Sequence, residues 1–145
     1  MEYKLEKATL NDIDKLIEYK KNTIYEYANN IDEEEINKID NYITNEVPKL
    51  LDDYLNIIVN GKKVGCVLIT KKDDGKLLDE IYLEEDYRCL GIGSMIIKNI
   101  LESNNIVYLW VYKDNIKAIK LYKRLGFNII TETDSRYYMK YSRGD

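Results

Sequence analysis

Residues 83–94 read Leu83-Glu84-Glu85-Asp86-Tyr87-Arg88-Cys89-Leu90-Gly91-Ile92-Gly93-Ser94, and they join an apolar strand to an apolar helix. A helix N-terminus attracts anions because its first N–H groups lack partners within the helix and carry the positive end of the dipole. Gly91 and Gly93 would let a phosphate approach the backbone closely. An ordinary turn has the same appearance, and the segment matches neither the P-loop nor the dinucleotide fingerprint. Its meaning therefore depends on the rest of the chain.

The chain before this loop predicts a strand and two helices. Residues 3–8 alternate as a strand does, and Thr9 with Asp12 forms a capping-box pattern that starts a first helix. Asp32 with Glu35 starts a second helix, which we expect Pro48 to end.

From residue 54 onward the pattern becomes that of strands. Asn60-Gly61 is a hairpin signal between two β-branched runs, and Asp73-Asp74-Gly75 precedes a third strand over 77–83, so residues 54–83 predict an antiparallel meander. After the loop we expect a helix, a buried strand over 106–112, a helix over 115–125 that Gly126 ends, and two final strands. This order predicts an α+β fold in one domain, residues 1–145, with a mixed, mostly antiparallel sheet of about seven strands flanked by about four helices.

Composition excludes several classes of site. The 145 residues include no histidine and two cysteines, so a Ser-His-Asp hydrolase, a His-ligated zinc site and a four-thiolate metal site are excluded, and we expect no metal. No apolar run approaches the roughly 20 residues of a membrane span, and the first residues lack the apolar core of a signal peptide. We therefore expect a cytoplasmic protein without a membrane partner, and two unpaired thiols at Cys66 and Cys89.

Charge is unevenly distributed along the chain. The net charge is −4, which argues against a nucleic-acid partner. Residues 1–53 hold 14 acidic and 7 basic side chains, a net of −7, whereas residues 54–145 hold 12 acidic and 15 basic, a net of +3. The two parts either have different ligands or reflect ordinary scatter of surface charge.

Two motifs in this order resemble the GNAT N-acetyltransferase superfamily. Arg88-x-x-Gly91-x-Gly93 is similar to the family's pyrophosphate loop. About 20 residues later, Asn115-x-x-Ala118-x-x-Leu121-Tyr122 and Gly126-Phe127 match its next helix and strand. The opening at residues 7–12 and the order of elements also agree, so the resemblance spans nearly the whole chain.

The resemblance implies acetyl-CoA as cosubstrate, in a groove where the strands ending near Leu83 and Tyr112 splay apart. The pantetheine arm would pair with backbone groups of Ile81 to Leu83, and the pyrophosphate would lie on backbone N–H groups from Cys89 to Ser94. The cations near the nucleotide end would be Lys113, Lys117, Lys120, Lys123 and Arg124, although a solvated helix face is the alternative for each lysine. The implied cofactor-binding residues are Ile81, Tyr82, Leu83, Arg88, Cys89, Leu90, Gly91, Ile92, Gly93, Ser94, Asn115 and Tyr122. The family often has a glycine and a basic residue at positions 89 and 90, where this chain has Cys89 and Leu90.

The resemblance also implies direct attack of an amine on the thioester. Tyr122 matches the family's proton donor for the thiolate. The alternative is that Tyr122 only packs in the core, because it lies on the apolar face of its helix. The Leu83 N–H is the candidate oxyanion donor. Asp79 and Glu80 are the candidate bases, and we expect their side chains to point to opposite faces of the strand. The alternative is that Asp79 and Glu80 are only exposed strand residues and that water is the base.

We therefore expect an N-acetyltransferase that acts on a primary amine, with a small cationic molecule or a peptide amine as acceptor. A noncatalytic domain that binds CoA as a sensor is the alternative, and a structural interaction module is a third class. The sequence leaves open the identity of the amine, the nature of the base, a homodimer, and any chemical role of Cys89.

Overall fold

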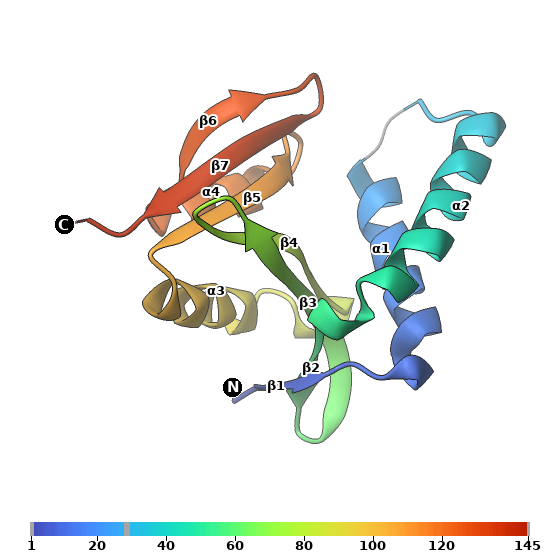
Figure 1. The fold of residues 1–145 in the computed structure, drawn as a ribbon, viewed down its shortest axis with the longest axis horizontal. Helices are drawn as coiled ribbons and strands as arrows, with labels where there is room; N and C mark the ends of the chain where they lie inside the picture. The colour runs from blue at the N-terminus through green and yellow to red at the C-terminus, as the bar shows by residue number, and fades with distance from the viewer. Residues whose placement is uncertain (1, 28–29, 145) are drawn as a thin grey trace.

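The computed structural model describes residues 2–27 and 30–144, and Figure 1 shows their arrangement. The helices and strands, in chain order, are β1 (Lys4–Lys7), α1 (Ile13–Tyr27), α2 (Glu33–Lys49), β2 (Tyr54–Val59), β3 (Lys62–Lys72), β4 (Gly75–Leu83), α3 (Ile92–Ser103), β5 (Ile106–Tyr112), α4 (Ile116–Arg124), β6 (Asn128–Glu132) and β7 (Arg136–Ser142). Short 3-10 turns at Leu10–Asp12, Leu51–Asp53 and Glu85–Tyr87 precede α1, β2 and α3. The predicted α+β class and element order are confirmed.

Seven strands form one sheet in the order β1-β2-β3-β4-β5-β7-β6. Every neighbouring pair is antiparallel except β4 and β5, which pair in parallel. That parallel pair requires a crossover, and α3 supplies it. The predicted mostly antiparallel, mixed sheet is thus present.

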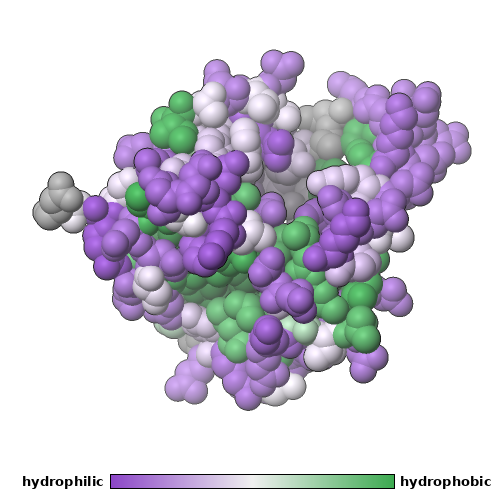
Figure 2. Space-filling view, in the orientation of Figure 1, coloured by the Kyte–Doolittle hydropathy of each residue, from purple (hydrophilic) through white to green (hydrophobic). Residues whose placement is uncertain are grey.

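Helices cover the sheet from both sides. One apolar cluster includes Ile92 and Ile96 of α3 and Ile119 of α4. The other joins Leu16 of α1 and Ile43 of α2 to side chains of β2 and β3. Figure 1 shows α1 and α2 side by side at one end of the molecule, away from β6 and β7. Figure 2 shows mainly hydrophilic side chains over α2 and a recess between α2 and the β6–β7 strands.

Turns and caps follow the residue types that predicted them. Asn60 and Gly61 both adopt positive φ, 52° and 76°, as a tight hairpin turn requires. The Thr9–Asp12 capping box forms, but it opens a 3-10 turn and α1 itself begins at Ile13. The Asp32 side chain accepts from the Glu35 N–H at 2.8 Å. Pro48, which we expected to end α2, lies inside its last turn, and the helix continues one residue further, to Lys49.

Among the described residues, no helix is long and apolar enough to cross a membrane.

Candidate active site

β4 and β5 separate halfway along their length. Their pairing runs from Lys76–Val107 to Leu78–Leu109, although β4 continues to Leu83 and β5 to Tyr112. The expected splay is therefore present. On the other side of β4, the Glu84 N–H donates to the Val64 carbonyl at 2.8 Å. Because alternate residues of a strand direct their backbone groups to opposite neighbours, those of Ile81 and Leu83 face the gap beside β5.

The loop into α3 exposes backbone donors at the mouth of this gap. Gly91 caps α3 with a left-handed backbone, φ 87°, and the first backbone bond within the helix runs from Met95 to Gly91 at 3.0 Å. The N–H groups of Ile92, Gly93 and Ser94 precede that bond, so they have no partner within the helix. A side chain at Gly93 would lie 3.8 Å from Leu83, so the start of α3 packs directly on the end of β4.

Cys89 also has a left-handed backbone, with φ 61°. This conformation favours glycine, and it accounts for the family's frequent glycine at this position. Both cysteines are free thiols, as expected, with Cys89 exposed and Cys66 buried.

The Arg88 side chain lies along the end of β4 and contacts α1. Its Nε donates to the Leu83 carbonyl at 2.7 Å, and its guanidinium carbon lies 5.1 Å from the centre of the Tyr82 ring. One guanidinium nitrogen lies 3.9 Å from Glu26 of α1. These partners hold the cation on β4 and α1, so the cofactor-binding role that the resemblance implies for Arg88 would require its side chain to move.

Tyr122 lies in α4 and is 9% exposed. Burial, with a smaller effect of Tyr27, raises the pKa of Tyr122 to about 12. Tyr27, at the end of α1, stacks on Tyr112 at the free end of β5, with ring centres 5.6 Å apart. The Tyr122 hydroxyl therefore lies near the splayed end of β5.

Asn115 caps the helix that carries Tyr122. Its side-chain oxygen accepts from the Ala118 N–H at 3.3 Å. The side-chain oxygen of Asn115, which the resemblance places among the cofactor-binding residues, is thus bonded to the backbone of its own helix.

β4 contains a β-bulge, which breaks the regular alternation on which the opposite-face expectation for Asp79 and Glu80 rests. Leu68 of β3 pairs with Glu80, and the next residue, Ile69, pairs with Leu78, so Asp79 is the extra residue. The bulge shifts the alternation: Leu78 packs with α3, whereas Glu80 contacts the α1 side. Asp79 is exposed and acts electrostatically on Glu80, so both carboxylates lie near each other.

Glu80 is 7% exposed and is surrounded by donors from three elements. The Tyr54 hydroxyl donates to Oε1 at 2.8 Å, the Cys66 thiol donates to Oε2 at 3.2 Å, and Lys20 Nζ lies 3.8 Å from Oε1. Burial raises the pKa of the Glu80 carboxyl, although Lys20, Tyr54 and Cys66 each act to lower it. A carboxylate with a raised pKa beside the splay has the properties of a general base.

A second carboxylate lies where β4 ends. The Tyr19 hydroxyl of α1 donates to Glu84, and the Tyr19 ring stacks on Tyr82 with centres 4.6 Å apart. The sequence interpretation missed Lys20, Tyr19, Tyr54 and Tyr27 as site residues. Helical and strand periodicity predicted their elements, but no local pattern indicates which residues of β4 they meet.

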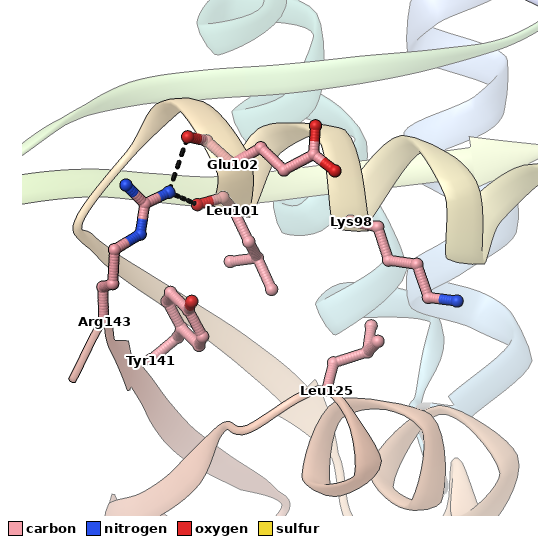
Figure 3. Close-up of a pocket in the computed structure, with 6 residues that line it drawn as sticks. All are labelled: Lys98, Leu101, Glu102, Leu125, Tyr141 and Arg143. Atoms are coloured by element: carbon pink, nitrogen blue, oxygen red, sulfur yellow. Dashed lines mark hydrogen bonds between the residues drawn. The ribbon is translucent and has the colours of Figure 1, made fainter.

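A cavity of about 360 Å³ lies away from this groove, between the ends of α3 and α4 and strand β7 (Figure 3). Arg143 crosses one side of it and donates to the Leu101 and Glu102 carbonyls at 2.6 and 2.5 Å, which satisfies the end of α3. The described part of the chain contains no group of three His, Cys, Asp or Glu side chains that could hold a metal ion.

Comparisons with known proteins agree with this geometry. The chain is 37% identical over 89 residues to an uncharacterised N-acetyltransferase of Methanocaldococcus jannaschii, a match that covers 52% of this chain and 39% of that protein. It is 32% identical over 63 residues to the spermine/spermidine N(1)-acetyltransferase of Bacillus subtilis, covering 39% and 41%. The chain thus spans about two-fifths of the length of these curated relatives.

The fold matches solved structures over nearly the whole chain. The PaiA N-acetyltransferase of Thermoplasma acidophilum, solved in complex with coenzyme A, superposes with a TM-score of 0.73 and 18% identity, over 98% of this chain and 99% of that one. The model of the acetyltransferase (GNAT) family matches residues 17–127, from α1 to the start of β6. The chain belongs to the GNAT acetyltransferase family.

Proposed function

We propose that the protein, as a single domain, transfers an acetyl group from acetyl-CoA to a primary amine by direct attack. The observation that carries this proposal is the splay between β4 and β5, with Glu80 of β4 beside Lys20 of α1 and with Tyr122 of α4 near Tyr27, whose ring stacks on Tyr112 of β5. The B. subtilis relative is named for acetylation of spermine and spermidine, which are amines, and this supports the acceptor class.

The groove fits acetyl-CoA, which supplies the acetyl thioester. The backbone groups of Ile81 and Leu83 that face the gap would bind the pantetheine amides as an added strand does. The N–H groups of Ile92, Gly93 and Ser94 would bind the pyrophosphate. Because Arg88 already donates to the Leu83 carbonyl, pairing at that oxygen requires Arg88 to move.

Glu80 is the base that we favour. Burial raises its pKa, which brings a carboxylate closer to the strength that proton removal from an ammonium group requires. In this proposal Glu80 accepts a proton from the acceptor, and the nitrogen forms a bond to the acetyl carbon. The carbon–sulfur bond then breaks, and Tyr122 gives its proton to the thiolate. The second proton that the nitrogen loses as the amide forms passes, through water, to the Tyr122 phenolate and restores the phenol. Asp79, the exposed neighbour on the bulge, is the competing candidate.

The acceptor side carries negative charge. Residues 1–53, which include α1 and α2, hold a net charge of −7, and Glu84 and Asp79 add carboxylates along β4. A small polyamine or a lysine-like amine therefore fits this side better than a neutral amine.

A thiol-release assay with acetyl-CoA and a panel of amines tests the proposal. We expect release with cationic amines, about 10²-fold loss of kcat in Glu80→Gln, and a smaller loss in the matched variant Asp79→Asn. A larger loss in Asp79→Asn would transfer the role of base to Asp79. Stabilisation by CoA without thiol release on any amine would contradict the enzyme and favour a sensor.

A further inference from the structure

Lys20 is a cation that the mechanism above leaves without a role. It lies on α1, and its side chain is 17% exposed although it carries an ammonium group. Its Nζ lies 3.8 Å from Glu80 Oε1, and the Glu80 side chain is 5% exposed. Most of the Lys20 side chain is thus withdrawn from solvent, and its charged end lies beside a buried carboxylate.

The other groups around Glu80 cannot replace this cation. Tyr54 on β2 and Cys66 on β3 donate hydrogen bonds as neutral groups, because burial raises the pKa of both well above neutral pH. Asp79 on β4 is a second negative charge beside Glu80 and disfavours its ionisation. From α1, Lys20 is therefore the positive charge that opposes both burial and Asp79.

We propose that Lys20 is a positioning residue of the acceptor site, which keeps Glu80 a carboxylate and directs Oε1 toward the incoming amine. The inference rests on the proposed function, since it assigns a residue to the same base. A second effect follows from the same position. An acceptor ammonium that approaches Glu80 also approaches the Lys20 ammonium, and like charges favour loss of the acceptor's proton.

Lys21 offers a matched control on the same helix. Its Nζ lies 3.7 Å from Asp40 of α2, so it forms an ion pair of nearly the same length that does not involve Glu80. Lys20→Met and Lys21→Met each remove one charge from α1. Only Lys20→Met removes the positive charge that lies beside Glu80.

The experiment measures kcat against pH for the wild type and the variants at saturating acetyl-CoA and spermidine. Dividing each variant profile by that of the wild type removes every titration that the substitution leaves unchanged. In Lys20→Met, a higher pKa of Glu80 and a higher pKa of the bound acceptor both lower the ratio toward low pH. For Lys20→Met we expect a ratio that falls by up to about tenfold toward low pH, because loss of a close opposite charge raises a carboxyl pKa by about one unit or more. Lys20→Arg should keep the wild-type profile, and Lys21→Met should give a flat ratio.

A ratio for Lys20→Met that is reduced equally at every pH would mean a structural role and would overturn the proposal. If Lys20→Met does not fold, Lys20→Gln takes its place. NMR titration of the Glu80 side-chain carboxyl carbon gives a measurement that does not depend on turnover. The pKa of Glu80 should be higher in Lys20→Met or Lys20→Gln than in the wild type, and an unchanged pKa overturns the inference. If the wild type is active and the pKa of Glu80 does not change in the Lys20 variants, only the inference about Lys20 is overturned. If the wild type releases no thiol with any amine, the proposed function is overturned.

Discussion

Replacing Tyr122 with Phe separates the chemistry of the hydroxyl from its contribution to folding. Within the described residues the hydroxyl makes no hydrogen bond, and the ring packs against Phe127 at 5.7 Å between centres. Tyr122→Phe keeps that packing and leaves none of the described residues without a hydrogen-bond partner. We therefore expect the free energy of unfolding to change by less than about 0.5 kcal/mol.

The magnitude of the catalytic effect follows from the pKa. The pKa of Tyr122 is about 12 and that of a thiol is near ~8.5, so proton transfer from Tyr122 to the thiolate is uphill by about 3.5 pKa units, or about 5 kcal/mol. So weak an acid acts only as the carbon–sulfur bond breaks, when the sulfur is most basic. A general acid contributes about 10² to 10⁴ in rate, and we expect the lower end here, about 10²-fold in kcat or ~2.7 kcal/mol.

The assay is steady-state thiol release with acetyl-CoA and spermidine, and acetyl-CoA affinity is measured by calorimetry. Tyr138→Phe is the control, because it also removes a hydroxyl without a partner among the described residues. We expect kcat to fall in Tyr122→Phe alone, with little change in acetyl-CoA affinity in either variant. A kcat for Tyr122→Phe within twofold of the wild type would refute Tyr122 as the acid.

Two further predictions concern stability. Burial acts to raise the pKa of Asp12, but hydrogen bonds from Lys63, the Thr9 N–H and Asn56 outweigh it and hold the pKa at about 2, below 3.8. The ionised Asp12 therefore stabilises the fold above about pH 4, and this is lost as pH falls toward 2. Because Lys63 is half exposed, we discount the effect to about 1–2 kcal/mol. In urea titrations at pH 7, the free energy of unfolding of Asp12→Asn should be lower than that of the wild type by that amount. The difference between the two proteins should narrow by pH 2, and a difference that stays constant with pH would contradict a role for the Asp12 charge. Gly91→Ala should lose about 1–2 kcal/mol, because its φ of 87° strains any side chain although nothing lies within 4 Å. Gly144→Ala, also in open space, is the control, and equal losses would show that backbone strain is not the cause.

Local chemistry made much of the fold predictable. Asn60-Gly61 predicted its hairpin, and Asp32 predicted a helix start, because each acts through atoms within three residues. The strand–loop–helix unit around Gly91 was likewise predictable. The bulge at Asp79 was not, since it depends on how β4 pairs with β3, and single-strand alternation cannot indicate an extra residue.

Side-chain partners across the fold could not be predicted either. Lys20 and Glu80 are 60 positions apart, and the packing of α1 on β4 decides their contact. The loop sequence likewise does not indicate that Arg88 turns toward Leu83 and α1 instead of toward the start of α3.

The two cysteines differ in a way that is useful at the bench. Cys66 is enclosed and hydrogen-bonded to Glu80, whereas Cys89 is exposed on the loop that precedes α3. A maleimide dye added to the native protein should therefore attach at one position, two residues before Gly91. The unmodified sequence thus offers a single-site fluorescent reporter with which the proposed binding of acetyl-CoA can be followed without engineered cysteines or a known acceptor.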